Sequence, residues 1–513
     1  MELRQDNSFG SAGGSVRTME VQQVLKNIEE KGYLLTPEAL KAITTSENPQ
    51  ELAEIALSNA QDKMVIDIND LISKIRAKTV DAHPQTVVIQ KTNFKPIGKE
   101  IDADVQIISK TPEDITGGSL VDFVGYFNAR YEQMYPILQT RGQGTLTKIE
   151  NLTKRRGEKV RIVALIGEKK HTKNGHILLR LEDPTGGVNA LIASWNKDLL
   201  MQAATLVSDE AICVEGSMNK DLFIIKNFYE PDIPRLNTAP VKTIDEDIAV
   251  CMMSDIHVGS KLFMRKNFDN LLDWLHGRVG DQKQRELATK VKYITIAGDL
   301  VDGIGVYPGQ EINLEITDIY EQYKAFSELM LRIPDWIQVI IAPGNHDAVR
   351  KSDPQPPLSP ELVPDLYKAS NFTMIGSPTT VSMHGMKELI YHGTSFSDFI
   401  SELPQASYEE NVKIMIEMLK KRHVHPIYGG KPITPEKYDK LMIEEVPDIF
   451  HTGESHMNCY EIYKGTICLN SGTWQGLTEF QVKHGQKPTP ARLPVVELKY
   501  ARTSHMHFDK LVT

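Results

Sequence analysis

The chain has 513 residues, of which 41% are hydrophobic and 25% are charged. This length exceeds the size at which one hydrophobic core stops growing, so two to four domains are expected. The formal net charge of −10 excludes a protein that coats DNA through an overall positive charge, because such proteins are basic. Any DNA contact must therefore come from local basic patches or from bound metal ions.

The cysteines give an indication of the compartment. They stand at positions 213, 251, 459 and 468 and form no CxxC pair, which argues against a zinc knuckle. Scattered thiols in a long chain are typical of a reducing compartment, so we predict a cytoplasmic protein. We find no signal peptide and no long apolar run, and expect no membrane span.

The N-terminal part of the chain predicts a polar tail followed by helices. Residues 1–18 are polar and rich in Gly and Ser, which predicts a disordered tail. Residues 19–78 predict a small helical domain, because "TPE" at 36–38 has the pattern of an N-cap, a first-turn proline and an acidic first turn. The same pattern recurs in "NPQELAEIAL" from position 48. We interpret this domain as a docking module without chemistry of its own.

Residues 79–140 are predicted to be a linker and a connecting helix. Residues 79–118 mix Pro, Lys, Asp and Thr with weak periodicity, which predicts little fixed structure. The following stretch, "LVDFVGYFNARYEQMYPILQ", has apolar residues at helical spacing. Its aromatic stripe is expected to be core or interface rather than a stacking platform, and it runs through Phe123, Phe127, Tyr131 and Tyr135.

Residues 141–240 are predicted to form a small barrel. From Lys159 the apolar residues alternate with period two, and Asn-Gly at 174–175 is a strong hairpin turn. Five short strands of this kind favour a Greek-key barrel of the oligonucleotide-binding (OB) type. Two interpretations stay open for its first long hairpin, which would either follow a DNA phosphate backbone or be a solvated tip. Its basic residues are Lys169, Lys170, His171 and Lys173.

Residues 241–513 predict an α/β domain. Short buried apolar runs alternate with helical stretches, and the runs are "DIAVCMMSD", "YITIAGDLVDG", "VIIAPGNHD", "LIYHGTS" and "DIFHTGE". Each run ends in polar residues, which is the layout of an α/β sheet with its functional groups at the carboxyl ends of the strands. The expected fold is therefore multidomain, α/β plus β.

The strand ends supply side chains that bind metal ions. Asp255 and His257 stand two apart, as do Glu454 and His456, and residues at this spacing share a face of an extended segment. The runs between them contribute Asp299, Asn345, His346 and His392. Any one of these would be weak evidence, but five strand ends in this order predict a metal site. Carboxylate, amide and imidazole ligands suit Mn²⁺, Mg²⁺, Fe or Zn²⁺.

The order of these motifs resembles that of the calcineurin-like metallophosphoesterase superfamily, whose pattern is D-x-H, G-D, G-N-H-[DE], H and G-H-x-H. The resemblance implies two divalent metal ions bridged by a carboxylate, with Mn²⁺ expected first. It assigns one metal to Asp255, His257, Asp299 and His456. It assigns the other to Asp299, Asn345, His392 and position 454.

The same resemblance implies roles for the residues beside these ligands. His346 would stabilise the transition state or protonate the leaving oxygen, with Asp347 as its partner. Two cations clamp a phosphodiester, and an imidazolium can protonate the departing alkoxide. Arg350 and Lys351 follow directly and are expected to grip a DNA phosphate, the alternative being a solvated loop.

Longer stretches narrow the match, among them "GNHDAVRKSDPQPPL", "KRHVHPIYGG", "LNSGTWQ" and "PTPARLPVVEL". They resemble the small subunits of archaeal family-D DNA polymerases, which also place an OB-type barrel before the phosphoesterase domain. The resemblance implies a proofreading 3′→5′ exonuclease that pairs with a large polymerase subunit and acts on DNA with a free 3′ end. A sliding clamp would be reached through the complex. The eukaryotic replicative B-subunits, which keep both domains, have lost the metal ligands.

One ligand position departs from the pattern, because position 454 has Glu where the family has His. Every other ligand position is filled, and the change is to another metal-binding side chain, so we favour a functional site. The alternative is a non-catalytic scaffold whose metal site is degenerating. A third possibility, a phosphoesterase for small substrates, is disfavoured by the barrel. A carboxylate adds negative charge, which should favour harder ions and give weaker activity or a more alkaline optimum.

Four further residues near these motifs are expected to be structural. His451 lies at an odd offset from Glu454, so it should face away from the site and not replace the missing histidine. His423 and His425 are expected to pack inside the domain, and Trp474 is expected in the core.

Overall fold

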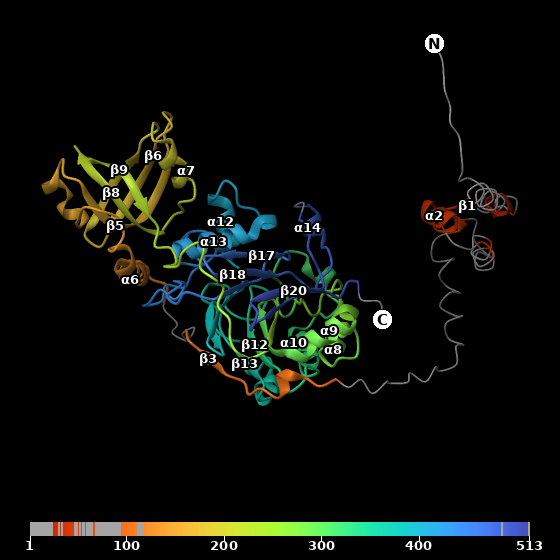
Figure 1. The fold of residues 1–513 in the computed structure, drawn as a ribbon. Coiled ribbons are helices and arrows are strands. Elements are labelled where there is room, and N and C mark those ends of the chain that lie inside the picture. Colours follow the sequence, from red (N-terminus) through yellow and green to blue (C-terminus); the bar gives the residue numbers. More distant parts are fainter. Residues whose placement is uncertain are drawn as a thin grey trace, which may run out of the picture. The chain divides into compact units, whose positions relative to one another are not determined.

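The computed structural model describes residues 24–28, 31, 34–45, 50, 53, 57, 65–66, 94–109, 117–483 and 486–510. The chain divides into two compact units, Met1–Lys91 and Thr92–Thr513 (Figure 1). The predicted tail at 1–18 lies outside the described residues, and the predicted helical domain at 19–78 is described only in part.

The described part of the first unit contains one helix whose start follows from the sequence. Helix α2 (Pro37–Thr45) begins at the proline after Thr36. The Thr36 hydroxyl accepts from the Ala39 N–H at 3.3 Å, as an N-cap residue does. Strands β1 (Leu34–Leu35) and β2 (Val65–Ile66) form a short parallel pair, which the sequence did not predict.

The prediction of little fixed structure for residues 79–118 is wrong for the part that the structure describes. Residues 97–99 form the short helix η1 (Ile97–Lys99), and β3 (Val105–Ile107) pairs antiparallel with β14 (Thr379–Met383). A strand this short shows no clear period in the sequence. Its partner lies far along the chain, so only the tertiary fold creates it.

The connecting helix is present as α6 (Leu120–Leu138), which starts with a capping box between Ser119 and Asp122. Its Tyr131 and Met134 pack with Val163 and Cys213 of the barrel. The aromatic stripe is thus core and interface, as predicted.

The segment after α6 forms a five-stranded barrel. Its strands are β5 (Val160–His171), β6 (Ile177–Asp183), β7 (Gly186–Ile192), β8 (Ala211–Asn219) and β9 (Leu222–Tyr229). They follow the order β5-β6-β7-β9-β8, and β8 pairs back onto β5, which closes the barrel. Its shorter elements are β4 (Thr145–Leu146), η2 (Ile149–Arg155) and α7 (Lys197–Ala203). The alternating positions of these strands fill one apolar core.

The remainder contains two six-stranded sheets. One has the order β13 (Phe372–Met374), β12 (Gln338–Ala342), β11 (Val291–Ala297), β10 (Ala249–Met253), β19 (Arg492–Glu497), β20 (Arg502–His507). The other has the order β17 (Asn458–Tyr463), β18 (Thr466–Ser471), β16 (Ile449–Thr452), β15 (Met386–Tyr391), β14, β3.

The two sheets pack face to face. Val250 and Ile340 of one sheet share a buried cluster with Val381 and Ile449 of the other. Helices cover the outer face of the first sheet, namely α8 (Arg265–Leu275), α9 (Gln282–Lys290), α10 (Ile319–Met330) and α11 (Pro364–Lys368). The outer face of the second sheet is covered by α12 (Phe396–Glu402) and α13 (Asn411–Lys421). The remaining short helices are η3 (Gln310–Asn313), η4 (Tyr408–Glu410) and α14 (Glu479–Lys483).

Trp474 is buried in the core between the first sheet and the helices on its outer face, where its ring centroid lies 5.0 Å from that of Phe268. This confirms the core position predicted for it. In the described part of the chain, no helix is both long and apolar enough to cross a membrane.

Candidate metal centre

The five predicted motifs meet at one edge of the two sheets. Strands β10, β11 and β12 run parallel, as do β15 and β16, and the carboxyl ends of parallel strands lie at the same edge. Each of these strands is followed directly by one of the motifs. The edge therefore collects Asp255, His257, Asp299, Asn345, His346, His392, Glu454 and His456.

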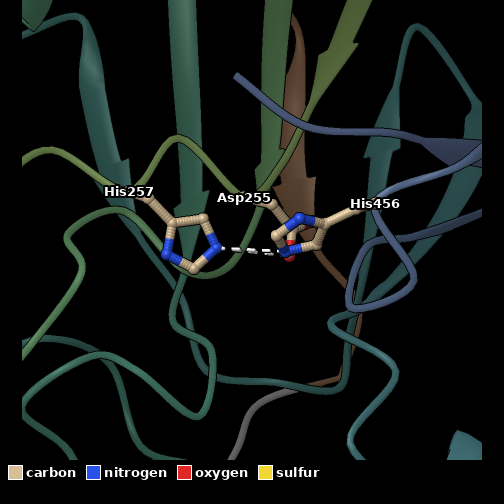
Figure 2. A group of neighbouring side chains, drawn as sticks. All are labelled: Asp255, His257 and His456. Atoms are coloured by element: carbon tan, nitrogen blue, oxygen red, sulfur yellow. Dashed lines mark hydrogen bonds and ion pairs between the residues drawn. The ribbon is translucent and has the colours of Figure 1, made fainter. Parts of the chain in front are cut away.

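The first group contains Asp255, His257 and His456 (Figure 2). The Nε2 atoms of the two imidazoles lie 3.1 Å apart. The Oδ1 atom of Asp255 lies 3.3 Å from Nε2 of His456 and 4.0 Å from Nε2 of His257. Three ligand atoms from two different sheets thus converge on one small volume.

The second group is arranged around His392. Its Nε2 atom lies 3.1 Å from Oδ1 of Asn345 and 3.1 Å from Oε2 of Glu454. Its Nδ1 atom lies 2.7 Å from the carbonyl oxygen of Ala297, which fixes the orientation of the ring. All three side chains therefore present their polar ends to the same point.

Asp299 lies between the two groups. Its Oδ1 atom is 3.4 Å from Nε2 of His392, and its Oδ2 atom is 3.7 Å from Nε2 of His257. Burial disfavours its charged form, but the imidazoles of His392 and His346 outweigh burial and hold the pKa of Asp299 well below its ordinary value. An ionised carboxylate with one oxygen toward each group is suited to bridge two cations.

The local electrostatics favour positive charge. Burial lowers the pKa of His392, but the carboxylates of Asp299 and Glu454 outweigh burial and raise that pKa well above its ordinary value. The negative charge that stabilises a protonated imidazole there would stabilise a metal cation in the same way.

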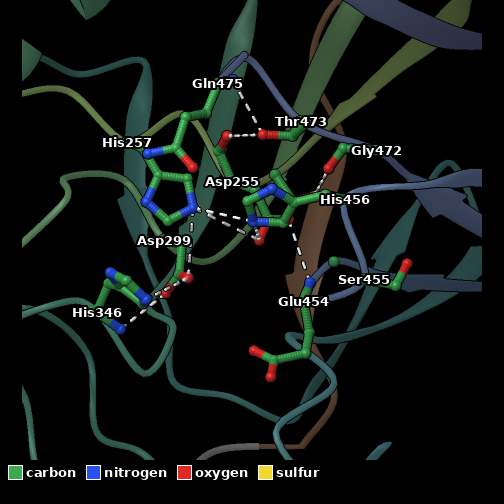
Figure 3. Close-up of polar contacts among 12 residues, drawn as sticks. Asp255, His257, Asp299, His346, Glu454, Ser455, His456, Gly472, Thr473 and Gln475 are labelled. Carbon is green, nitrogen blue, oxygen red and sulfur yellow. Dashed lines mark hydrogen bonds and ion pairs between the residues drawn. The ribbon is translucent and has the colours of Figure 1, made fainter. Parts of the chain in front are cut away.

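Glu454 occupies the position where the family pattern has histidine. Its carboxylate reaches the second group, as its distance to His392 shows, and its backbone N–H donates to Oδ2 of Asp255 at 3.2 Å (Figure 3). Position 454 therefore still presents an oxygen atom that could bind a metal.

The backbone at this edge is held in an uncommon conformation. The predicted ligands with positive φ are Asp255 (50°), His257 (53°), Asp299 (53°), Glu454 (64°) and His456 (58°). Non-glycine residues adopt this region rarely, and clusters of such residues occur at functional sites. Gly344 explains one close approach, because a Cβ atom there would lie 2.2 Å from Oδ1 of Asp299.

A cation would satisfy atoms that the protein leaves without a partner. Oδ1 of Asp255 is buried and accepts no hydrogen bond from the part of the chain that the structure describes. The nearest polar group given for this oxygen is Nε2 of His456 at 3.3 Å, and a buried carboxylate oxygen without a hydrogen bond is better satisfied when it coordinates a metal. Among the described residues, every group of carboxylates and imidazoles close enough to hold an ion lies at this edge. The donors present therefore fit divalent metal ions.

His346 lies at the site, but its predicted partner is wrong. Its Nδ1 atom is 2.7 Å from the carbonyl oxygen of Asp302, and its Nε2 atom is 3.9 Å from Oδ2 of Asp299. Asp347 points the other way and accepts from the Gly344 N–H at 2.8 Å and the Tyr323 hydroxyl at 3.1 Å. Burial, and then the charge of Asp299, raise the pKa of Asp347 to about 6. Through these contacts Asp347 stabilises the "GNHD" turn.

Asp302 is a residue of the site that the sequence did not predict. Its Oδ1 atom lies 3.2 Å from Nδ1 of His257, and it also accepts from the Gln475 amide at 2.9 Å. Gln481 does the same for His456, with its amide nitrogen 2.8 Å from Nδ1. The second Asp of "GDLVDG" was the available signal, since ligating histidines are commonly held by a carboxylate.

The predicted phosphate-binding pair after the "GNHD" turn makes contacts within the protein, although Lys351 is exposed. Arg350 donates to the carbonyl oxygen of Pro354 and pairs with Glu436 at 2.8 Å. The Lys351 ammonium donates to the carbonyl oxygens of Asn345 and Asp347. These side chains stabilise the turn, and their sequence position alone could not show that backbone carbonyls would face them.

In the first hairpin of the barrel, two of the basic side chains also make contacts within the protein. Lys169 donates to the carbonyl oxygen of Leu206, and Lys170 pairs with Glu168 at 2.5 Å. Lys173 is exposed at the turn between β5 and β6.

The three histidines predicted to be structural, His423, His425 and His451, are buried inside the domain. His451 is buried, with Nδ1 3.1 Å from Glu388 and Nε2 2.9 Å from Ser471. His423 contacts Asp439, and His425 lies between Asp353 and Asp398.

Comparisons with known proteins agree with the predicted family. The family model for the B-subunit of DNA polymerases alpha and epsilon matches residues 250–459. The DNA polymerase II small subunit of Archaeoglobus fulgidus is 36% identical over 488 residues, covering 94% of this chain and 96% of that protein. The protein of the same name from Methanothermobacter thermautotrophicus is 38% identical, covering 77% and 82%.

The chain belongs to the family of DNA polymerase II small subunits. A protein of the same name from Methanocaldococcus jannaschii is 38% identical, and the match covers 69% of that protein. The range that matches the family model includes every residue of the metal centre from Asp255 to His456. The metal centre thus lies within the part of the small subunit that this family model describes.

Proposed function

We propose that this chain is a metal-dependent 3′→5′ exodeoxyribonuclease, the proofreading subunit of a replicative DNA polymerase. One observation carries the proposal: carboxylate, amide and imidazole side chains from five strand ends converge at one edge, with Asp299 placed between the two groups. A scaffold has no need to gather these side chains at one edge, because buried carboxylates brought close together cost stability. Residues 241–513 would be the calcineurin-like phosphoesterase domain.

The residues at the edge are suited to two divalent ions, with Mn²⁺ as the first choice and Mg²⁺, Fe or Zn²⁺ as alternatives. Asp255, His257 and His456 would hold one ion and Asn345, His392 and Glu454 the other, with Asp299 shared. Bound there, the ions would neutralise the phosphodiester and activate the attacking water.

His346 would handle the proton of the leaving oxygen. Its Nδ1 atom faces the carbonyl oxygen of Asp302 at 2.7 Å, so Nε2 is the atom turned toward Asp299 and the metal centre. From Nε2 a protonated ring could donate to the departing 3′ oxygen. Asp347 and Lys351 would support this role by holding the turn that carries His346.

The barrel supports a nucleic-acid substrate. A closed five-stranded barrel with strand order β5-β6-β7-β9-β8 agrees with an OB-type fold, a common platform for single strands. Lys170 and Lys173 are exposed basic residues of its first hairpin. The family name supports a large polymerase subunit as the partner, through which a sliding clamp would be reached.

The experiment uses the full chain with Mn²⁺ and 5′-labelled DNA that ends in a 3′ mismatch. We expect shortening from the 3′ end that is lost in Asp299→Ala and in His346→Ala. Asp335→Ala, a change of an exposed aspartate outside the site, is the matched control and should keep full activity. The assay is repeated with the large subunit present.

The outcomes separate the proposal from its alternative. Activity only in the complex would mean that the site needs its partner to work. No shortening in either assay would contradict the proposal and leave the scaffold, with Glu454 as the first ligand lost.

A further inference from the structure

Three loops border the His257 and His456 side of the metal centre, namely residues 261–264, 303–314 and 476–483. They are joined by backbone hydrogen bonds, from the Lys261 N–H to the Asn313 carbonyl at 2.9 Å and from the Gly476 N–H to the Leu262 carbonyl at 2.9 Å. The loops therefore form one continuous margin.

This margin is anchored to the predicted ligands themselves. Asp302, which contacts His257, accepts from the Gln310 amide with its carbonyl oxygen at 2.8 Å and its carboxylate at 2.9 Å. Gln310 is buried and lies within the second loop. In the third loop, Gln481 contacts Nδ1 of His456 at 2.8 Å. The position of the margin relative to the centre is thus set by side chains that also orient two of the ligands.

Large apolar side chains project from the margin into solvent. They are between 40% and 70% exposed, and they are Leu262, Ile304, Tyr307, Ile312, Leu477 and Val482. A single exposed leucine is ordinary on a protein surface. Several on three segments, two of which are each hydrogen-bonded to 261–264, beside a buried, charged centre indicate a surface that binds something apolar. We call these residues the apolar rim.

The chemistry of the neighbouring centre identifies what the rim receives. If the centre takes a phosphodiester of DNA, as proposed above, the groups next to that phosphate are sugars and bases. Bases stack on apolar and aromatic side chains without sequence preference. In a duplex the base faces are covered by their neighbours and the edges are paired, so only unpaired bases are available.

We propose that the apolar rim receives the unpaired bases at the 3′ end of DNA and thereby selects frayed or mismatched ends over paired ends. The proposal rests on the proposed function. It assigns substrate selection to Leu262, Ile312 and Leu477, one from each loop.

The test compares the rates at which the full chain hydrolyses two substrates in the presence of Mn²⁺. The substrates are single-stranded DNA and bis(4-nitrophenyl) phosphate, a phosphodiester without bases. The rim variant is Leu262→Ser, Ile312→Ser and Leu477→Ser combined. We expect the ratio of kcat/KM for DNA to that for the small diester to fall about tenfold, the loss of one stacking contact. The preference for a mismatched over a paired 3′ end should fall toward one.

A matched control and a binding measurement keep the test independent of folding. The control, Leu236→Ser with Leu331→Ser, also changes exposed leucines but on segments outside the rim, and should keep the wild-type ratio. In the Asp299→Ala background, binding should raise the fluorescence of 2-aminopurine at the 3′ end of DNA, because the base leaves the stack of its neighbours, and the rim variant should abolish this rise.

Other results would overturn the proposal in distinguishable ways. An unchanged ratio together with an unchanged fluorescence rise would show that the rim does not touch bases. Loss of the large subunit from the complex with an unchanged ratio would make the rim a protein contact. Absence of hydrolysis of both substrates by the wild type would instead overturn the proposed function.

Discussion

The metal centre and the pair His423–His425 have the same local sequence signature, two polar residues separated by one, and both lie among buried carboxylates. They differ in how the polar atoms are satisfied. Oδ2 of Asp439 accepts from Arg130 at 2.6 Å and lies 2.8 Å from His423, and Oδ1 accepts from the Tyr126 hydroxyl at 2.9 Å. Asp255, in contrast, has a buried oxygen without a donor in the described part of the chain.

The imidazoles show the same contrast. His425 has one nitrogen 2.9 Å from Asp353 and the other 3.1 Å from Asp398, so both of its polar atoms are used. At the metal centre, Nε2 of His257 faces Nε2 of His456 at 3.1 Å. The ring nitrogens of His423 and His425 all face a carboxylate or a backbone N–H, whereas those two Nε2 atoms face each other, as they would around a shared ligand. Residue type and spacing alone do not separate the two.

The largest effect is expected from breaking the satisfied cluster. Asp439→Asn removes the charge that pairs with the fully buried Arg130, and leaving a buried charge unpaired costs about 3–5 kcal/mol of stability. Urea unfolding of the full chain measures this loss. Asp221→Asn, at an exposed pair with Arg156, is the control and should change stability by less than about 0.5 kcal/mol. A loss below about 1 kcal/mol for Asp439→Asn would contradict the contrast between the clusters.

A smaller effect is expected where a carboxylate orients a ligand. Asp302→Asn should weaken Mn²⁺ binding and nuclease activity by about 10–100-fold, because Asp302 fixes the imidazole of His257. Titration calorimetry with Mn²⁺ measures the affinity without relying on turnover. Asp398→Asn alters the equivalent contact of His425 and should lower stability while leaving Mn²⁺ affinity unchanged. Equal effects of both variants on affinity would remove the distinction.

The satisfied cluster also predicts a pH dependence. Burial, together with the charge of Arg130, lowers the pKa of His423 to about 4, below the value of about 6.5 in an unfolded chain. Between these values the unfolded chain binds more protons, so stability is complete above about pH 6.5 and is lost as pH falls toward 4. We expect a loss of roughly 1–2 kcal/mol between pH 7 and pH 5. His423→Gln should flatten this slope in urea unfolding, and an unchanged slope would contradict the assignment.

The smallest effect concerns the altered ligand. Glu454→His removes a negative charge from the second group, and we expect a modest rise in activity with Mn²⁺ and a less alkaline optimum. A pH–rate profile of the nuclease measures both. Lower activity at every pH would show that the carboxylate is the better ligand in this chain.

Much of the site followed from the sequence because strand ends are local features. Asp255, His257, Asp299 and His392 each follow an apolar run directly, so their shared edge could be predicted. The prediction that Asp347 is the partner of His346 was wrong because adjacent residues in a tight turn point in different directions. The hydrogen bonds of Arg350 were missed because its acceptor is a backbone carbonyl in a later turn. The residue types in a sequence do not show where backbone carbonyl groups will point.

By itself, the sequence determined the order of most elements, the candidate ligands at the strand ends, the family and the carboxylate at position 454. Apolar periodicity and residue type record these features locally. Only the tertiary structure decided which polar groups are satisfied, that β3 completes a sheet, that Asp302 lies against His257 and that residues 303–314 and 476–483 both bond to 261–264. These depend on contacts between segments far apart in the chain, which local pattern does not encode.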